Sequence, residues 1–245
     1  MNYKKIRFRP KNFKECNPEI FKRLIKNNPY MGQVYSFPDI LYPHPCRADL
    51  QKIIFKSRVT KNKSHTSKIH LEIGSGSGRY LIEWANRYKN DFFIGFELRY
   101  KRLVFAAKKI KKQNLNNIIL MRERGEFFYE YFKKNTVDYL HINFPDPWSK
   151  KNHQKNRLLN INFLTKLSSI MNLHGEFRFK TDHLEYFEKV TGMISKMNNF
   201  YISEYTKDLH KSSLNNKNIL TEFEMLFKSK DNPSIYYFLA KKIKK

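Results

Sequence analysis

The chain turns sharply from a strand into a helix around residues 69–78, which read IHLEIGSGSG. An aliphatic stretch ends in three alternate glycines, and helical spacing begins directly after them in GRYLIEWANRY. Glycine lets the backbone approach a ligand closely, and the N-terminus of the following helix carries positive dipole. The segment therefore predicts a ligand-binding turn at Gly74, Gly76 and Gly78, although an ordinary tight turn is the plainer alternative.

Two acids indicate which ligand this turn would accept. Glu72 stands just before the glycines, where it would repel a pyrophosphate but suit the sulfonium and amino groups of S-adenosylmethionine. Glu97 ends a second strand, DFFIGFE, roughly 20 residues beyond the first glycine, as expected for an acid that accepts ribose hydroxyls. A solvated acid at a strand end is the alternative for Glu97. Together the two acids favour S-adenosylmethionine as the cofactor.

A second informative block reads HINFPDPWSKKNHQKNR, at residues 141–157. Pro145 and Pro147 cannot continue a central strand, so they hold Asp146 at the carboxyl edge of the sheet, where open α/β folds bind ligands. Trp148 offers a flat face for a base, and a lysine-rich run follows it. The block predicts an RNA site, with a plain surface loop as the alternative.

The rest of the chain alternates strands and helices, which predicts a mostly parallel sheet from residue 68 onward. The last two strand patterns, 200–205 and 234–242, predict an antiparallel hairpin at the sheet edge. Residues 1–67 are basic and rich in proline, and we expect an N-terminal arm with one short helix around 19–27. The expected strands are 69–74, 91–97, 117–122, 137–144 and 175–181, and the expected helices are 77–89, 99–113, 126–133, 157–172 and 183–198.

Composition supports a polyanionic partner. The 245 residues carry a net charge of +26, although an AT-rich genome would also enrich lysine. Cys16 and Cys46 have no metal-ligand spacing, and we expect no metal. No apolar run approaches the roughly 20 residues of a membrane span, and no signal-peptide pattern follows the first residues. We expect a cytoplasmic protein without a membrane partner, and favour a monomer.

The order of these motifs resembles the bacterial tRNA (guanine-N7)-methyltransferase family. LEIGSGSG, GFE, NFPDPWSKK with KNR, FKTD at 179–182 and TEFE at 221–224 occur in the family's order, over about residues 35–240. The resemblance implies a Rossmann-like class I methyltransferase, an α/β fold with a mostly parallel seven-stranded sheet over residues 68–245. It also implies methyl transfer from S-adenosylmethionine to N7 of a guanine in the tRNA variable loop.

The resemblance also implies roles for individual residues. Glu72, Gly74, Gly76, Gly78 and Glu97 match cofactor-binding positions, and Asp146 matches both a cofactor position and the catalytic acid. The third cofactor acid falls on Glu123 by counting back from Pro145, and a one-residue slip would place Arg124 there. The substrate-binding positions are Lys150, Asp182, Thr221, Glu222, Phe223 and Glu224. The RNA-contact positions are Asn152, His153, Gln154, Lys155, Asn156 and Arg157.

Two other functions fit parts of the pattern. A methyltransferase acting on an exocyclic base amine also carries a proline-rich strand-end motif, but the order Pro-Asp-Pro-Trp argues against it. A non-catalytic RNA-binding protein could keep the fold alone, and the intact Glu72, Glu97 and Asp146 count against that.

Overall fold

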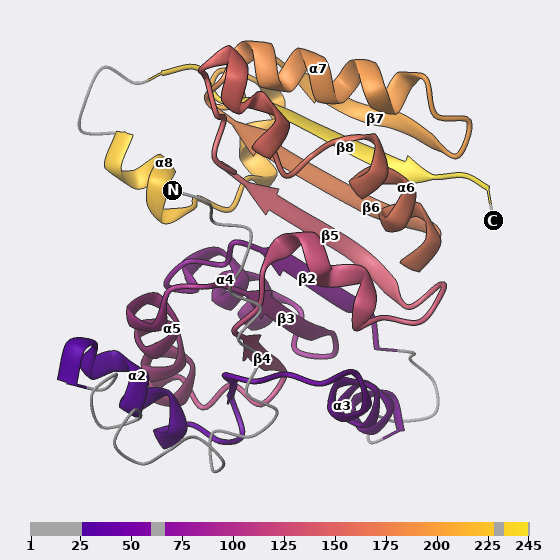
Figure 1. Ribbon diagram of the computed structural model, residues 1–245. Helices are drawn as coiled ribbons and strands as arrows, with labels where there is room; N and C mark the ends of the chain where they lie inside the picture. Colours follow the sequence, from indigo (N-terminus) through magenta and orange to yellow (C-terminus); the bar gives the residue numbers. More distant parts are fainter. Residues whose placement is uncertain (1–25, 60–66, 228–232, 245) are drawn as a thin grey trace.

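The computed structural model describes residues 26–59, 67–227 and 233–244, and the described chain contains one mixed sheet (Figure 1). Its strands run in the order β1-β4-β3-β2-β5-β6-β8-β7. All neighbouring pairs are parallel except β6–β8 and β7–β8, so the expected antiparallel C-terminal hairpin is confirmed. The strands are β1 (Leu41–Tyr42), β2 (Ile69–Ile73), β3 (Phe92–Phe96), β4 (Ile118–Met121), β5 (Val137–Asn143), β6 (Met171–Thr181), β7 (Phe200–Thr206) and β8 (Tyr236–Lys242).

Of the helices expected from residue 68 onward, two differ from the prediction, and α2, α3 and α8 were not expected at all. The helix expected over 126–133 is a 3-10 turn, and the one expected over 157–172 begins only after a separate 3-10 turn. Asn160 sets that later start, because its side-chain oxygen accepts the N–H of Phe163 as an N-cap. The helices are α2 (Pro29–Gln33), α3 (Arg47–Val59), α4 (Arg79–Arg87), α5 (Tyr100–Lys112), α6 (Ile161–Ile170), α7 (Leu184–Ser195) and α8 (Glu222–Phe227), and the 3-10 turns are η2 (Val34–Ser36), η3 (Gly125–Glu130), η4 (Lys151–Asn156) and η5 (Ser213–Lys217).

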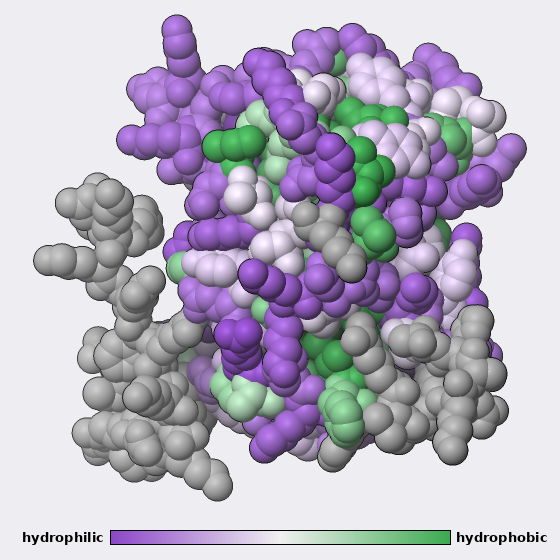
Figure 2. Space-filling view, turned by 90° about the vertical axis from the view of Figure 1, so that its right-hand side faces the viewer, coloured by the Kyte–Doolittle hydropathy of each residue, from purple (hydrophilic) through white to green (hydrophobic). Residues whose placement is uncertain are grey.

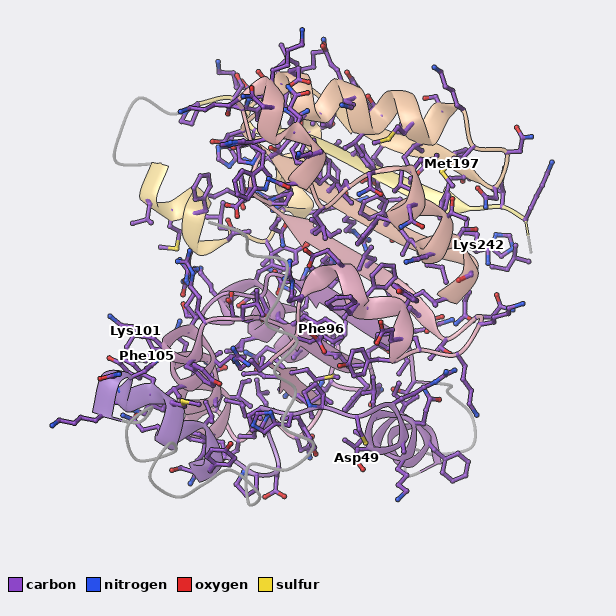
Figure 3. The ribbon with its side chains drawn as sticks, in the orientation of Figure 1. Asp49, Phe96, Lys101, Phe105, Met197 and Lys242 are labelled. Atoms are coloured by element: carbon purple, nitrogen blue, oxygen red, sulfur yellow. The ribbon has the colours of Figure 1, made fainter. Side chains whose placement is uncertain are left out.

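The described part of the N-terminal region packs on the sheet. β1 pairs in parallel with β4 and adds an eighth strand to the seven that were expected. Leu41 of β1 and Leu50 of α3 are each 2 % exposed. Lys101 of α5, labelled in Figure 3, has its ammonium 5.8 Å from the ring centre of Tyr30 on α2. The helix expected around 19–27 lies almost entirely outside the described residues. The domain boundary expected at residue 67 stays a prediction. β1 and α3 lie before this boundary in the chain and pack against the sheet.

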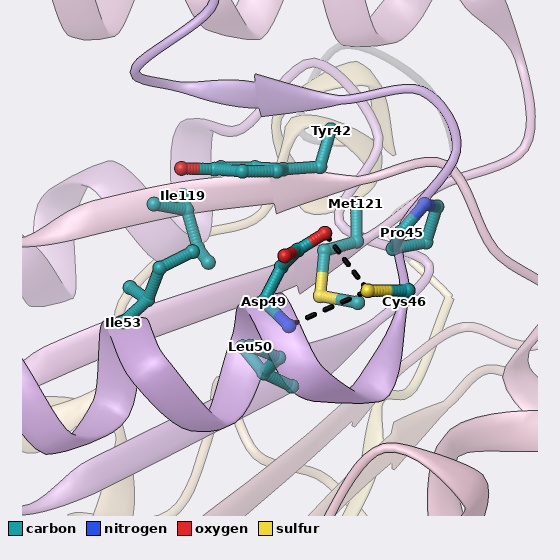
Figure 4. A pocket seen from close by; sticks show the side chains of 8 residues that line it. All are labelled: Tyr42, Pro45, Cys46, Asp49, Leu50, Ile53, Ile119 and Met121. Atoms are coloured by element: carbon teal, nitrogen blue, oxygen red, sulfur yellow. Dashed lines mark hydrogen bonds between the residues drawn. The ribbon is translucent and has the colours of Figure 1, made fainter. Parts of the chain in front are cut away.

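The start of α3 is capped by a cysteine (Figure 4). The Asp49 N–H donates to Cys46 Sγ at 3.4 Å, and the thiol donates to the Asp49 carboxylate at 2.8 Å. Tyr42, Ile53 and Met121 pack around this pair and leave no room for a ligand. We therefore interpret Cys46 as a helix cap.

The two faces of the sheet differ in chemistry. On one face, Leu71, Ile142 and Phe179 join a buried apolar cluster with α3, α6 and α7. On the other, the half formed by β3 and β4 is apolar beneath α4 and α5. The remaining half of that face carries the register row Glu72, His141 and Arg178. Buried polar side chains need partners or a ligand, so this polar half-face marks the functional part of the molecule.

The face seen in Figure 2 is largely hydrophilic, with green apolar patches broken up by purple side chains. Lys242 at the end of β8, labelled in Figure 3, is by contrast buried. Its ammonium donates to the carbonyls of Ser168 and Met171 at 2.7 and 2.8 Å, and so ties the C-terminal strand to α6 and β6. Within the described residues, no helix combines the length and apolar character that a membrane crossing needs.

Candidate active site

The glycine loop lies between β2 and α4, at the carboxyl edge of the sheet. Gly74, Gly76 and Gly78 have φ values of +81°, +56° and +83°, which only glycine adopts without strain. A Cβ on Gly78 would lie 2.9 Å from Ala106 of α5, whereas Gly74 has open space on its Cβ side. The loop is therefore packed against α5 at one end and open to a ligand at the other.

Glu97 follows β3 and faces this loop. One carboxylate oxygen accepts the N–H of Gly76 at 3.1 Å, and the other accepts the N–H groups of Leu98 and Arg99 at 2.8 Å each. These bonds fix the carboxylate beside the glycine loop, and a carboxylate has further lone pairs for hydroxyl donors. The position suits the ribose-binding role expected from the sequence.

Glu72 lies on β2 beneath the loop and is 2 % exposed. Asn143 of β5 donates to one carboxylate oxygen at 2.9 Å, and the second oxygen is buried with no hydrogen-bond partner in the described structure. Burial raises the pKa of Glu72 to about 8, although the bond from Asn143 and the nearby Lys180 oppose the rise. A buried acceptor without a donor fits a ligand that brings a cation or an N–H group.

The structure favours Glu123 over Arg124 for the third cofactor position. Glu123 follows β4 and is half-buried, and its carboxylate accepts the hydroxyl of Tyr131 and the N–H of Arg124. Arg124 is exposed and its guanidinium pairs with Glu126 at 2.8 Å. Glu72 near the end of β2, Glu97 after β3 and Glu123 after β4 thus lie at the carboxyl ends of three neighbouring parallel strands, at the edge where open α/β folds bind ligands.

The Pro-Asp-Pro loop follows β5 on the other side of β2. Phe144 and Trp148 flank it with φ values of +50° and +43°, a strained conformation for large residues that is common at functional sites. Asp146 is exposed, and Trp148 is 38 % exposed. The loop therefore presents a carboxylate and an aromatic face to solvent beside the glycine loop.

Arg157 supports this loop from inside. It is 3 % exposed, its Nε donates to the Pro147 carbonyl at 2.7 Å, and its Nη1 donates to Glu185 of α7 at 2.9 Å. Its guanidinium also lies over the ring of Tyr186. In this structure Arg157 is directed inward, unlike the rest of the expected RNA-contact residues. Those residues are exposed or half-buried on η4, together with the adjacent lysines: Lys150, Lys151, Asn152, His153, Gln154, Lys155 and Asn156.

The TEFE motif forms the start of α8. Thr221 and Glu224 make a capping box, in which each side chain accepts the other's backbone N–H, at 3.1 and 2.8 Å. Glu222 accepts the hydroxyl of Ser77 in the glycine loop and the ammonium of Lys109 on α5, the latter at 2.9 Å. The Phe223 ring lies 4.4 Å from that of Phe144. Helix α8 therefore bridges the glycine loop and the Pro-Asp-Pro loop. Asp182 is exposed directly after β6.

Sequence reasoning missed Lys180, which links these parts. Lys180 is 3 % exposed, and its ammonium donates to Asn218 at 2.5 Å, to the Ile219 carbonyl at 2.9 Å and to Glu224 at 3.1 Å. The signal was present in β6, where Glu176, Arg178 and Lys180 alternate with phenylalanines. Charged residues at period two in a central strand indicate a polar face.

The raised pKa of Glu72 predicts how the free energy of unfolding of the ligand-free protein depends on pH. A folded pKa near 8 against 4.5 means that Glu72 contributes stability below about pH 4.5, which is lost as the pH rises through about 8. Glu72→Gln does not titrate, so we expect its stability advantage over the parent to grow by on the order of 2–4 kcal/mol between pH 5 and 9, at about 1.4 kcal/mol per pKa unit. Urea unfolding at both pH values measures this, with exposed Glu83→Gln as the control. An advantage that does not change with pH would contradict the raised pKa.

A sheet of this strand order, with acids at the strand ends around a glycine loop, is the architecture of the Rossmann-like methyltransferases that use S-adenosylmethionine. A model of the Methyltransf_4 methyltransferase family matches residues 66–236. A solved structure titled "Structure of an Antibiotic Related Methyltransferase" aligns with a TM-score of 0.55 and 20% identity, covering 80% of this chain and 93% of that one. At that identity the likeness shows the fold alone.

Curated relatives narrow the class. A tRNA (guanine-N(7)-)-methyltransferase of Enterococcus faecalis is 40% identical over 66% of this chain and 75% of its own length, and one of Geobacillus kaustophilus is 30% identical over 85% and 92%. The chain belongs to this family. A bifunctional glycosyltransferase/methyltransferase of Fusobacterium nucleatum is 36% identical over 95% of this chain, which spans 36% of that relative's length.

Proposed function

We propose that this chain transfers the methyl group of S-adenosylmethionine to N7 of a guanine in the variable loop of tRNA, in the cytoplasm. The observation that carries the proposal is the edge where four neighbouring parallel strands end in acids: Glu123, Glu97, Glu72 and, in the loop after β5, Asp146. Glu97 holds the glycine loop through Gly76, Glu72 lies in the strand that leads into this loop, and Asp146 stands beside an aromatic face and exposed lysines. Family membership supports the same reading.

The cofactor would be held by the glycine loop and its acids. Gly74, Gly76 and Gly78 allow close approach of the backbone, and Glu97 and Glu123 offer acceptors for ribose hydroxyls and an adenine amine. The unpartnered oxygen of Glu72 suits a cationic group. When bound, S-adenosylmethionine supplies the activated methyl group. Within the described residues, no cluster of three or more metal-ligating side chains stands near this edge or elsewhere.

In the reaction, the side chains of this protein position the guanine and stabilise the charge that develops on it. Guanine N7 has a free lone pair, so no proton has to be removed before it attacks. The ring gains positive charge as N7 takes the methyl, and the Asp146 carboxylate stabilises that charge or accepts from the N1 and N2 donors of guanine. Trp148 supplies a stacking face. Lys150, Asp182, Thr221, Glu222, Phe223 and Glu224 complete the substrate side, where α8 spans the two loops.

Incubation of the purified protein with unmodified tRNA and labelled S-adenosylmethionine tests the proposal. Nucleoside analysis should show label in 7-methylguanosine. Label in an exocyclic-amine product would move the enzyme to the alternative class, and calorimetry without any heat from S-adenosylmethionine would make it a non-catalytic RNA binder.

The exposed lysines of the loop should contribute to tRNA affinity. Replacing Lys150, Lys151 and Lys155 with glutamine should weaken tRNA binding and reduce the log–log salt slope by up to about 2, at about 0.7 per single-strand phosphate contact. The matched control replaces Lys133, Lys134 and Lys196, which lie at the opposite edge of the sheet. Filter binding over a salt series gives both slopes, and equal slopes would make the loop ordinary solvated surface.

A further inference from the structure

The polar half-face of the sheet carries a cavity that lies apart from the candidate active-site residues. Its volume is about 300 Å³, at the lower end of the range of small-molecule sites. It lies between α4, the strands β6, β7 and β8, and the segment 209–219. None of the expected cofactor or substrate residues lines it.

One wall of the cavity is aromatic. Tyr80, Trp84 and Tyr88 come from α4 and its end, and Tyr237 comes from β8. A buried chain of contacts holds this wall in place: the Tyr80 hydroxyl lies 3.2 Å from His141, which lies 3.2 Å from His70. Flat, fixed rings suit the face of a nucleobase, whichever base it is.

Next to this wall, Arg178 of β6 supplies an unused cationic donor. Arg178 pairs with Glu176 through Nη2, while its Nη1 is buried and has no acceptor in the described structure. Its guanidinium lies 5.1 Å from the Trp84 ring, and the cavity lining also includes Arg87 and exposed Lys217. A buried guanidinium N–H without an acceptor beside two further cations suits a phosphate oxygen.

Two further polar side chains of the lining already have partners. Glu204 accepts the hydroxyl of Tyr237 at 3.0 Å, and its other lone pairs could accept base N–H donors. Lys180 has three acceptors, one of them Glu224 of the capping box. The cavity is therefore joined through Lys180 to α8, which bridges the two loops of the candidate active site.

We propose that this cavity is a nucleotide-binding pocket, in which a base lies against the aromatic wall and its phosphate reaches Arg178. The inference rests on the proposed function, since a nucleotide of the tRNA next to the methylated guanine is one source and a free mononucleotide is the other. A nucleotide bound in the pocket would then influence the position of α8, because Lys180 lines the pocket and also binds Glu224 of α8.

Fluorescence of Trp84 tests the pocket directly. The chain has two tryptophans, so Trp148→Phe leaves Trp84 as the sole reporter. Unmodified tRNA and guanosine 5′-monophosphate are titrated separately into this variant. A saturable change with tRNA assigns the pocket to an RNA nucleotide, and a change with the mononucleotide alone assigns it to a free nucleotide. No change with either probe overturns the proposal.

Two further substitutions in the Trp148→Phe background establish where the probe binds. Arg178→Gln should raise the half-saturation concentration roughly tenfold or more, as loss of a charged hydrogen bond does. Lys217→Gln, on the exposed rim where folding is not at risk, should raise it by a smaller factor, and Lys112→Gln on α5 should leave it unchanged. A fluorescence response that neither pocket variant alters overturns the proposal. Methyl transfer by the parent protein is measured separately, so failure of the proposed function would be seen independently of Trp84.

Discussion

Replacing Asp146 with asparagine is expected to lower single-turnover methyl transfer by about 10²–10³-fold, the range seen when one preorganised electrostatic partner is lost. The substitution keeps the shape of the side chain, and the two prolines and Arg157 keep the shape of the loop. What it removes is the negative charge beside a ring that becomes cationic. Rapid-mixing assays with saturating tRNA measure the rate.

The affinity for tRNA separates catalysis from recognition. Most of that affinity should come from phosphate contacts elsewhere, so Asp146→Asn should change it only slightly. Asp39→Asn, an exposed acid in the N-terminal region, is the control for the loss of one charge. If turnover survives and tRNA affinity collapses, Asp146 is a recognition residue and the electrostatic account is wrong.

Replacing Glu97 with alanine is expected to weaken S-adenosylmethionine binding roughly 10- to 150-fold, because a charge-assisted hydrogen bond contributes about 1.5–3 kcal/mol. The loss has two sources in this structure. Ribose hydroxyls would lose their charged acceptor, and the N–H of Gly76 would lose the oxygen that holds it. Isothermal titration calorimetry gives the affinity.

A second substitution separates these two sources. Glu97→Gln keeps one oxygen for a backbone N–H but removes the charge, so its affinity should fall between those of the parent and the alanine variant. Thermal unfolding of both variants shows whether the fold survives. A folded alanine variant with the parent's affinity would remove Glu97 from the cofactor site.

The central strands and the glycine loop were predictable because their signals are local. Period-two and aliphatic patterns mark β2, β3 and β5, and alternation with helices implies that they are parallel. Parallel order then brings the strand ends together, so the amino-acid sequence alone is enough to expect Glu72 and Glu97 at one edge of the sheet. The Pro-Asp-Pro loop could be predicted at the same edge, because it follows directly on the parallel strand β5.

The missed features depend on contacts between distant segments. β1 is two residues long and carries no pattern, and it exists because Leu41 packs beside β4. Arg157 lies within a basic run, so its sequence context favoured a surface role, but Glu185 and Tyr186 lie 28 and 29 positions further along the chain and draw it inward. The bridge from Glu222 to Ser77 spans 145 positions, which no periodicity can show.

The order of strands at the C-terminal edge has a consequence for biosynthesis. β8, near the end of the chain, lies between β6 and β7, and β7 pairs with no other strand in the described sheet. During translation, β7 would therefore emerge and wait with both edges unpaired until residues 236–242 leave the ribosome. A nascent chain stalled just short of β8 should expose β7 to proteases and chaperones, although β2 to β6 could already be paired.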